Sequence, residues 1–202
     1  KKFESTVRCC TQNGVRGGSA TVHFPIWHQE IEDILVLKNN KGTEDNRVRK
    51  LDYSIQISKM FYERFMNDED ITLFSPHEAP GLYDAFGTDS FDALYKKYEK
   101  DSSINKKTIP AQDLFSDLLK ERAETGRIYI MNLDHCNTHS SFKDKVSMSN
   151  LCQEITLPTT PINAIDDSQG EIALCILSAI NVGQLNNLED LENLCELAVR
   201  AL

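Results

Sequence analysis

The sequence predicts an α/β fold with a largely parallel sheet. Segments with the apolar–polar alternation of strands take turns along the chain with segments whose apolar residues recur at helical spacing. Such a succession is typical of parallel strands that are joined by crossover helices. Hydrophobic residues make up 40% and charged residues 26% of the 202 residues, so the chain carries enough apolar surface for a buried core.

A glycine-rich segment comes first. Residues 7–25 should begin as a strand or loop and then enter a turn. Gly14, Gly17 and Gly18 allow backbone angles that other residues resist, and they let a ligand approach the main chain closely. The segment is not a nucleotide-binding P-loop, because no Gly-Lys-Ser/Thr follows it. A plain surface turn is the alternative interpretation.

Helical spacing predicts five helices. The first should follow Pro25, because Ile26, Ile31 and Leu35 recur at helical spacing. Gly126 is suited to end the fourth helix, and Asn187 is suited to cap the last one. The expected helices are residues 26–39, 59–67, 90–100, 111–125 and the segment from Leu188 onward.

Five segments have the composition of strands. In one of them Tyr53, Ile55 and Ile57 alternate with polar neighbours, which is typical of a strand with one buried face. The others are short and mostly apolar, and one of them ends at Pro76. The expected strands are residues 52–58, 70–76, 127–133, 150–157 and 171–180.

The charge distribution limits the possible partners. The net charge is −9, from 31 acidic and 22 basic residues, which argues against a general nucleic-acid-binding protein. Residues 1–50 are basic, with nine Lys and Arg against six acids, whereas residues 150–202 hold eight acids and one base. The basic, glycine-containing start could receive a small anion such as a nucleotide, or it could be a solvated surface with uneven charge.

The location of the protein is predicted from what the sequence lacks. No apolar run approaches the ~18 residues that span a bilayer, so no membrane association is expected. The first residues also lack the apolar core of a signal peptide. We therefore expect a cytoplasmic protein.

The six cysteines do not have the spacing of a disulfide-rich secreted framework, so a reducing compartment is expected. Cys136 and His139 have a spacing that could donate two zinc ligands, but no second pair follows, and we predict no metal site. Functional cysteines in this chain should therefore act as redox or radical residues.

Residues 150–157 contain the side chains that are best suited to catalysis. If this segment is extended, Asn150, Cys152 and Glu154 share one strand face with ~7 Å between successive members. They would supply a hydrogen-bond donor, a sulfur nucleophile or radical site, and a general base. The alternative is the wet face of a half-exposed strand. Cys175, inside the apolar stretch 172–177, could simply be a small buried hydrophobe.

The chain resembles the catalytic large (alpha) subunits of ribonucleoside-diphosphate reductases, most closely the class I enzymes of bacteria and phages. The resemblance extends over essentially the whole chain. It is carried by CTQNGVRGGSAT, DITLFSP, PGLYDAF, TGRIYIMNLDHCNTHS, SNLCQEITLPTTP and GEIALCILSAINVG. It implies the central part of a ten-stranded α/β barrel whose radical cysteine lies on a central finger loop.

The resemblance implies a role for each of the four candidate catalytic residues. Cys152 corresponds to the thiyl-radical cysteine that removes hydrogen from the ribose 3′ carbon. Glu154 corresponds to the base that takes the 3′-hydroxyl proton, and Asn150 to the amide that hydrogen-bonds the ribose. Cys175 corresponds to one member of the redox pair that becomes a disulfide.

The glycine-rich segment also has a counterpart in the family. It corresponds to the flexible loop through which an effector nucleotide selects the substrate base. The residues assigned to this substrate and effector loop are Cys10, Gln12, Arg16, Gly17 and Gly18.

The other cysteines have no catalytic counterpart at matching positions. Cys9 and Cys10 are adjacent, but the family's second redox cysteine lies upstream of the loop, so they are not expected to form the redox pair. Cys136 and Cys195 are expected to be structural.

The resemblance further implies the partners and cofactors. No cofactor is expected in this chain. A small subunit with a di-metal centre would supply the radical, nucleoside triphosphates would act as allosteric effectors, and thioredoxin or glutaredoxin would reduce the disulfide. The partners would be that small subunit, the remaining segments of the large subunit, a second large subunit in a homodimer, and ribonucleoside diphosphates.

Both ends of the sequence are interpreted as truncated. Residues 1–202 should be one segment of the catalytic barrel domain, without the ATP-cone, and inactive alone. The alternatives are a non-catalytic piece that binds effector nucleotides or partner fragments, and a fragment of a cobalamin-dependent class II reductase.

Overall fold

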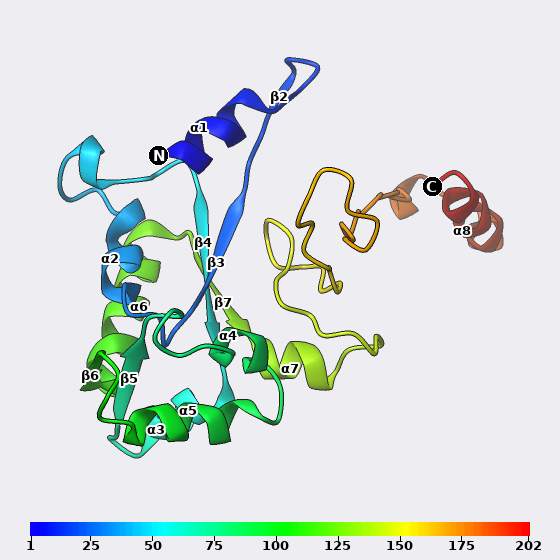
Figure 1. Ribbon diagram of the computed structural model, residues 1–202. Coiled ribbons are helices and arrows are strands. Elements are labelled where there is room, and N and C mark those ends of the chain that lie inside the picture. The colour runs from blue at the N-terminus through cyan, green and yellow to red at the C-terminus, as the bar shows by residue number, and fades with distance from the viewer. The chain divides into compact units, whose positions relative to one another are not determined.

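A parallel sheet of three strands, in the order β3-β4-β7, lies at the centre of the first of two units, Lys1–Pro158 (Figure 1). These strands are β3 (Thr21–Pro25), β4 (Asp52–Ile57) and β7 (Ile128–Asn132). The computed structural model describes the backbone of residues 1–202 and every side chain except that of Gln12.

Two smaller sheets accompany the parallel one. β5 (Asp70–Phe74) pairs antiparallel with β6 (Lys106–Pro110), and β1 (Thr11–Gln12) pairs antiparallel with β2 (Arg16–Gly17). Among the residues described, the strands form open sheets and do not close into a barrel. The expected α/β class is confirmed.

Helices connect the strands of this unit. Short 3-10 turns at Val36–Lys38 and Glu44–Asn46 lie between β3 and β4. None of the helices described is both long and apolar enough to cross a lipid bilayer. The helices are α1 (Lys2–Cys9), α2 (Ile31–Leu35), α3 (Lys59–Met66), α4 (Leu82–Ala85), α5 (Phe91–Lys100), α6 (Ala111–Thr125) and α7 (Leu133–Thr138).

The two faces of the parallel sheet differ in chemistry. In the register, Phe24 pairs with Ile55 and Ile55 with Ile130, so successive strands present apolar side chains on the same face. This apolar face packs with the buried residues of α2 and α6 into one core. The next row, His23–Ser54–Tyr129, presents polar side chains on the opposite face. We call that side the polar face; the candidate site lies on it.

Aromatic side chains fill much of the core. Phe91 contacts Trp27, Phe61, Phe86 and Tyr95, with ring centroids between 4.6 and 6.5 Å apart. All five residues are at most 1% exposed. Offset and edge-on pairs at these separations stabilise a core beyond the burial of their area.

The buried Tyr95 hydroxyl is fully used. It accepts a hydrogen bond from the Thr72 amide at 2.8 Å and donates to the Thr72 carbonyl at 2.6 Å. Burial is the main cause that raises the pKa of Tyr95 above its usual value. This pair of contacts fixes α5 against β5.

Most elements predicted from periodicity are confirmed. The predicted strands at 52–58, 70–76 and 127–133 and the predicted helices at 59–67, 90–100 and 111–125 all form, with ends that differ by one or two residues. Gly126 ends α6 with a φ of +64°, as expected for a glycine cap.

The first part of the chain differs from the prediction. Residues 2–9 form helix α1, where a strand or loop was expected from residue 7. The predicted helix at 26–39 begins only at Ile31. The reason is that the Ile26 amide bonds to the Gln56 carbonyl at 2.9 Å and the Phe74 amide to the Trp27 carbonyl at 2.8 Å. These bonds to neighbouring strands keep Ile26 and Trp27 out of the helix, which begins only after the following turn.

The strands predicted at 150–157 and 171–180 are wrong. Residues 151–153 form a turn, and Gln153 has a φ of +64°, which an extended strand excludes. Residues 172–180 have no regular structure, and Glu171 takes part only in an isolated bridge with Thr160. A strand needs a neighbouring strand for its backbone groups, and this segment has none among the described residues of its unit.

The second unit, Thr159–Leu202, contains a 3-10 turn at Val182–Gln184 and helix α8 (Asp190–Arg200). The final helix begins two residues later than predicted. The Asn187 side chain accepts the Glu189 amide at 3.1 Å in the turn before it. Ile172, Leu174 and Leu177 are 68 to 80% exposed in this unit. The single catalytic segment expected over residues 1–202 stays a prediction.

We predict that Phe91→Ala lowers the free energy of unfolding by about 3–5 kcal/mol, because it leaves a cavity among four rings. Urea titration followed by circular dichroism measures the change. Leu119→Ala is the control, since Leu119 lies on α6 and is 53% exposed. Equal losses for the two variants would contradict the assignment of the aromatic cluster as the core.

Candidate functional site

Residues 147–155, which we call the cysteine loop, cross the polar face of the parallel sheet. Three side chains of the sheet hold carbonyl oxygens of the loop. Gln56 donates from its side-chain nitrogen to Ser147 at 2.6 Å, and Thr21 donates from its hydroxyl to Leu151 at 2.5 Å. His23 contacts the Ser149 oxygen through Nε2 at 3.1 Å.

Two side chains of the loop contact the same row of the sheet. The side-chain amide nitrogen of Gln153 donates to the Ser54 hydroxyl on the central strand β4. The Cys152 thiol lies near the Tyr129 hydroxyl on β7, and this neighbour, followed by burial, raises the pKa of Tyr129. With Thr21 and His23 on β3 and Gln56 and Ser54 on β4, hydrogen bonds hold the loop at two neighbouring strands.

The cysteine loop also closes on itself through Asn150. The Asn150 side-chain oxygen accepts the Ile155 amide at 3.1 Å and the Ser149 hydroxyl at 3.2 Å. Both contacts go to the oxygen, so they orient the amide with its NH₂ group as the donor. The backbone N–H of Gln153 donates to the backbone carbonyl oxygen of Asn150 at 3.3 Å, and this bond closes the turn.

This geometry corrects the argument from alternation. Asn150, Cys152 and Glu154 do not share a strand face, because the turn at Gln153 interrupts the chain between the last two. Asn150 is half-buried, whereas Cys152 and Glu154 are exposed. A loop, not a strand, carries the three predicted catalytic residues.

His23 is the most constrained titratable group beneath the loop. Its Nε2 faces a carbonyl oxygen and must donate, so the neutral ring carries its proton there. Its Nδ1 is buried without a partner among the described atoms. Burial lowers the pKa of His23 below its usual 6.5, and the bond to Ser149 offsets this only in part. The neutral ring is the form that fits the site.

The predicted substrate and effector loop forms the β1–β2 hairpin. Thr11 pairs with Gly17, and Asn13 and Gly14 turn the chain with φ values of +51° and +71°. Cys10 and Arg16 are exposed. The side chain of Gln12, a predicted loop residue, lies outside the described part of the structure.

Gly18 joins the hairpin to the end of α1. A Cβ at this position would collide with the carbonyl oxygens of Val7 and Cys10. At Gly17, by contrast, no atom lies within 4 Å of the position that a Cβ would take. The close backbone approach therefore requires glycine at residue 18 and not at residue 17.

A pocket of about 410 Å³ lies between this hairpin and the cysteine loop. The hairpin residues that line it include Cys10, Arg16, Gly17 and Gly18, and the cysteine loop contributes Leu151. Leu151 directly precedes Cys152. The structure thus brings two predicted functional segments, about 140 residues apart in sequence, to one cavity.

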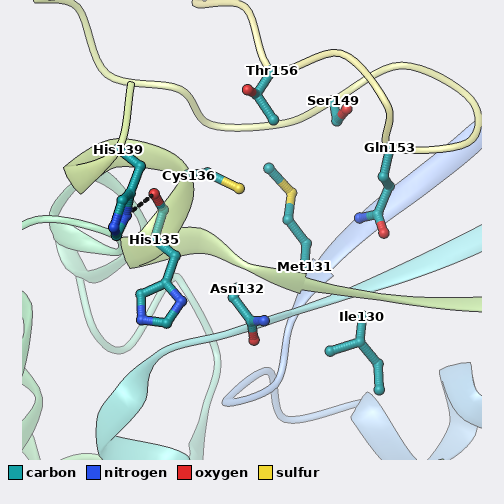
Figure 2. A pocket seen from close by; sticks show the side chains of 9 residues that line it. All are labelled: Ile130, Met131, Asn132, His135, Cys136, His139, Ser149, Gln153 and Thr156. Atoms are coloured by element: carbon teal, nitrogen blue, oxygen red, sulfur yellow. Dashed lines mark hydrogen bonds between the residues drawn. The ribbon is translucent and has the colours of Figure 1, made fainter. Parts of the chain in front are cut away.

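A second pocket of about 420 Å³ lies between the cysteine loop, β7 and α7 (Figure 2). Figure 2 shows Ser149, Gln153 and Thr156 above it and His135, Cys136 and His139 at one side. The His135 carbonyl contacts His139 Nδ1 at 3.2 Å. Burial, with Asp134, raises the pKa of the Cys136 thiol, so this cysteine is held as a thiol.

Two further predictions concern a metal site and the redox cysteine. The described residues contain no group of three or more His, Cys, Asp or Glu that could hold a metal ion. Cys175 is exposed and lies in the unit Thr159–Leu202. Its meeting with Cys152 at one substrate stays a prediction.

The full length of the chain, residues 1–202, matches the family described as ribonucleotide reductase, barrel domain. The chain belongs to this family. The ribonucleoside-diphosphate reductase subunit alpha of Buchnera aphidicola subsp. Schizaphis graminum is 58% identical over 207 residues, which cover 100% of this chain and 27% of that protein.

Further relatives support the same assignment. Ribonucleoside-diphosphate reductase 1 subunit alpha of Escherichia coli strain K12 is 58% identical over 168 residues, 81% of this chain and 22% of that protein. The subunit alpha of Enterobacteria phage T4 is 45% identical over 210 residues, 100% of this chain and 28% of that protein. The matched residues thus span between 22% and 28% of the length of these relatives.

The residues of the sheet that hold the cysteine loop of this barrel-domain chain were not predicted from the sequence. His23 and Ser54 lie 126 and 99 residues from their loop partners in the sequence. One signal was present: Ser54 and Gln56 are polar, yet both are 0% exposed in a central parallel strand, where apolar residues are usual.

We predict that acidification weakens this barrel-domain chain through His23. Because its pKa is lowered on folding, the unfolded state binds the proton first as the pH falls below about 6.5, and stability is lost from there toward the lower folded pKa. His23→Gln removes this titration. Thermal unfolding followed by circular dichroism, at small pH steps between pH 7.5 and 5, should show that this variant loses less stability on acidification than wild type.

The control for this prediction is His77→Gln, because His77 is exposed. It should follow the wild-type pH dependence. If His23→Gln and wild type lose stability in parallel, the buried histidine is not the titrating group.

We also predict that Gly18→Ala destabilises the chain by about 1 kcal/mol or more, since a methyl group there displaces the hairpin from α1. Gly17→Ala, the neighbouring control, should change the free energy of unfolding by less than about 0.5 kcal/mol. Urea titration compares the two variants, and a larger loss for Gly17→Ala would refute the close approach at Gly18.

Proposed function

We propose that this chain is the central part of the catalytic alpha subunit of a class I ribonucleoside-diphosphate reductase. The observation that carries the proposal is the pocket between the β1–β2 hairpin and the cysteine loop. A base that is held by the hairpin would place its ribose next to Cys152. The match of residues 1–202 to the barrel domain of this family supports the same reading.

The reaction begins on the Cys152 sulfur. A thiyl radical there takes the hydrogen atom from the ribose 3′ carbon, which forms an S–H bond and leaves a substrate radical. The Glu154 carboxylate takes the proton of the 3′ hydroxyl, and the Asn150 NH₂ group donates to the ribose. Deprotonation at the 3′ oxygen makes it easier to lose the 2′ hydroxyl as water.

Cys175 and a partner thiol outside this chain complete the reduction. They supply two protons and two electrons and become a disulfide, and Cys152 returns its hydrogen atom to the 3′ carbon. Each turnover therefore converts one ribonucleoside diphosphate and two thiols into a deoxyribonucleoside diphosphate, water and a disulfide. Thioredoxin or glutaredoxin would then reduce the disulfide.

The hairpin selects the substrate. A nucleoside triphosphate effector would change the conformation of residues 10–18, and Gln12 and Arg16 would then favour one substrate base over others. Arg16 offers a planar set of donors to a base or phosphate, and the glycines permit the rearrangement. Couplings of this kind are typically worth about 1–3 kcal/mol.

The complete enzyme requires partners. We assign the radical source to a small subunit with a di-metal centre, and we assign a homodimer of large subunits in the cytoplasm. The remaining segments of the large subunit would supply the second redox thiol.

The test uses the full-length alpha subunit that contains this chain, with a radical-generating small subunit, a dithiol and a ribonucleoside diphosphate. Cys152→Ala should abolish deoxynucleotide formation, since no other group can take the 3′ hydrogen, while the substrate Kd stays within about twofold of wild type. Chromatography of the nucleotides and equilibrium binding measure the two quantities.

Cys195→Ala is the matched control, because Cys195 lies on α8 and is exposed. It should retain wild-type turnover. Multiple turnovers by Cys152→Ala would rule out the assigned mechanism.

A further inference from the structure

Gln153 occupies an unusual position in the cysteine loop. It lies between Cys152 and Glu154, the two residues to which the proposed function assigns chemistry. Its φ of +64° is in the left-handed region, which residues other than glycine rarely adopt. Such a conformation persists only where surrounding contacts hold it.

The contact that opposes this strain is made by the Gln153 side chain. Its amide nitrogen donates to the Ser54 hydroxyl. Ser54 is 0% exposed and lies in β4, the central strand of the parallel sheet, so the acceptor is fixed by strands on both sides. The contact joins the loop to the most rigid part of the sheet.

The register explains why this contact controls the cysteine. Cys152 directly precedes Gln153, and Ser54 pairs with Tyr129 on β7, whose hydroxyl lies near the Cys152 thiol. Consecutive loop residues therefore meet neighbouring strands in one row. If the Gln153 side chain leaves Ser54, the turn at residue 153 is released, and the neighbouring Cys152 is no longer held in place beside Tyr129.

We propose that Gln153 is a positioning residue, which uses its contact with Ser54 to hold the left-handed turn and to set the place of the Cys152 thiol. Its importance for catalysis rests on the proposed function, whereas its effect on the thiol does not. Gln153 itself need not touch substrate. It acts by fixing the geometry from which the thiol reacts, and misplacement of a reacting atom by about 1 Å can cost 10²-fold in rate.

The chain offers variants that separate the contact from the backbone conformation. Gln153→Asn keeps the amide and suits a positive φ, but it is one methylene too short for Ser54. Ser54→Ala removes the acceptor and leaves Gln153 intact. Ser58→Ala is the control, since the Ser58 hydroxyl follows the same strand, is buried, and has no partner among the described atoms.

The experiment uses the full-length alpha subunit and two readouts. The first is the rate at which iodoacetamide alkylates Cys152, measured by quantitative peptide mass spectrometry with Cys195 as the internal reference. The second is kcat and KM for ribonucleoside diphosphate reduction. The variants are Ser54→Ala, Gln153→Asn, the double variant and Ser58→Ala.

Ser54→Ala and Gln153→Asn should each raise the alkylation rate of Cys152 about fivefold or more, and lower kcat about tenfold with KM within about twofold, as expected for one lost hydrogen bond. The double variant should match either single variant, because both remove the same contact. Ser58→Ala should match wild type in both readouts.

Two outcomes would overturn the proposal: wild-type alkylation rates in both single variants, or effects that multiply in the double variant. If Ser54→Ala does not fold, Gln153→Asn decides alone, since residue 153 is in a half-buried loop. If the wild-type subunit makes no deoxynucleotide, the proposed function fails, and the alkylation rates still decide the role of Gln153.

Discussion

The structure depends on the contact between the polar face of the parallel sheet and the cysteine loop. Ser54 and Gln56 are completely buried in a central strand, and buried polar groups are costly unless they are hydrogen-bonded. The loop in turn has irregular backbone whose carbonyl groups need donors. The sheet and the loop supply these partners to each other: the Gln56 side chain donates to the Ser147 carbonyl oxygen, and the Gln153 side chain donates to the Ser54 hydroxyl. Loss of either partner leaves the other unsatisfied.

The opposite face of the sheet keeps this contact in register. Ile55 and Ile57 are buried in the core with α2 and α6, so a shift of β4 by one residue would move them to the polar face and Ser54 into the core. The apolar core therefore fixes the row His23–Ser54–Tyr129. Packing on one side of the strands sets the chemistry on the other.

The hairpin at residues 11–17 is held differently from the cysteine loop. Its attachment to α1 depends on the absence of a side chain at Gly18, and its exposed residues have space around them. The cysteine loop, by contrast, is held by hydrogen bonds from two strands. In the proposed function the hairpin selects among substrates, for which a mobile attachment is suited, and the cysteine loop carries the radical, for which a firmly held loop is suited.

Elements with a local signal could be predicted from the sequence. The alternation of Tyr53, Ile55 and Ile57 predicted β4, helical spacing predicted α6, and the family resemblance assigned a role to Cys152 that stays a prediction. Features that depend on distant partners became visible only in the folded chain. The tertiary structure turned residues 150–154 into a loop, because contacts from 99 to 130 residues away hold them. It also left residues 172–180 without regular structure, because a strand forms only beside another strand.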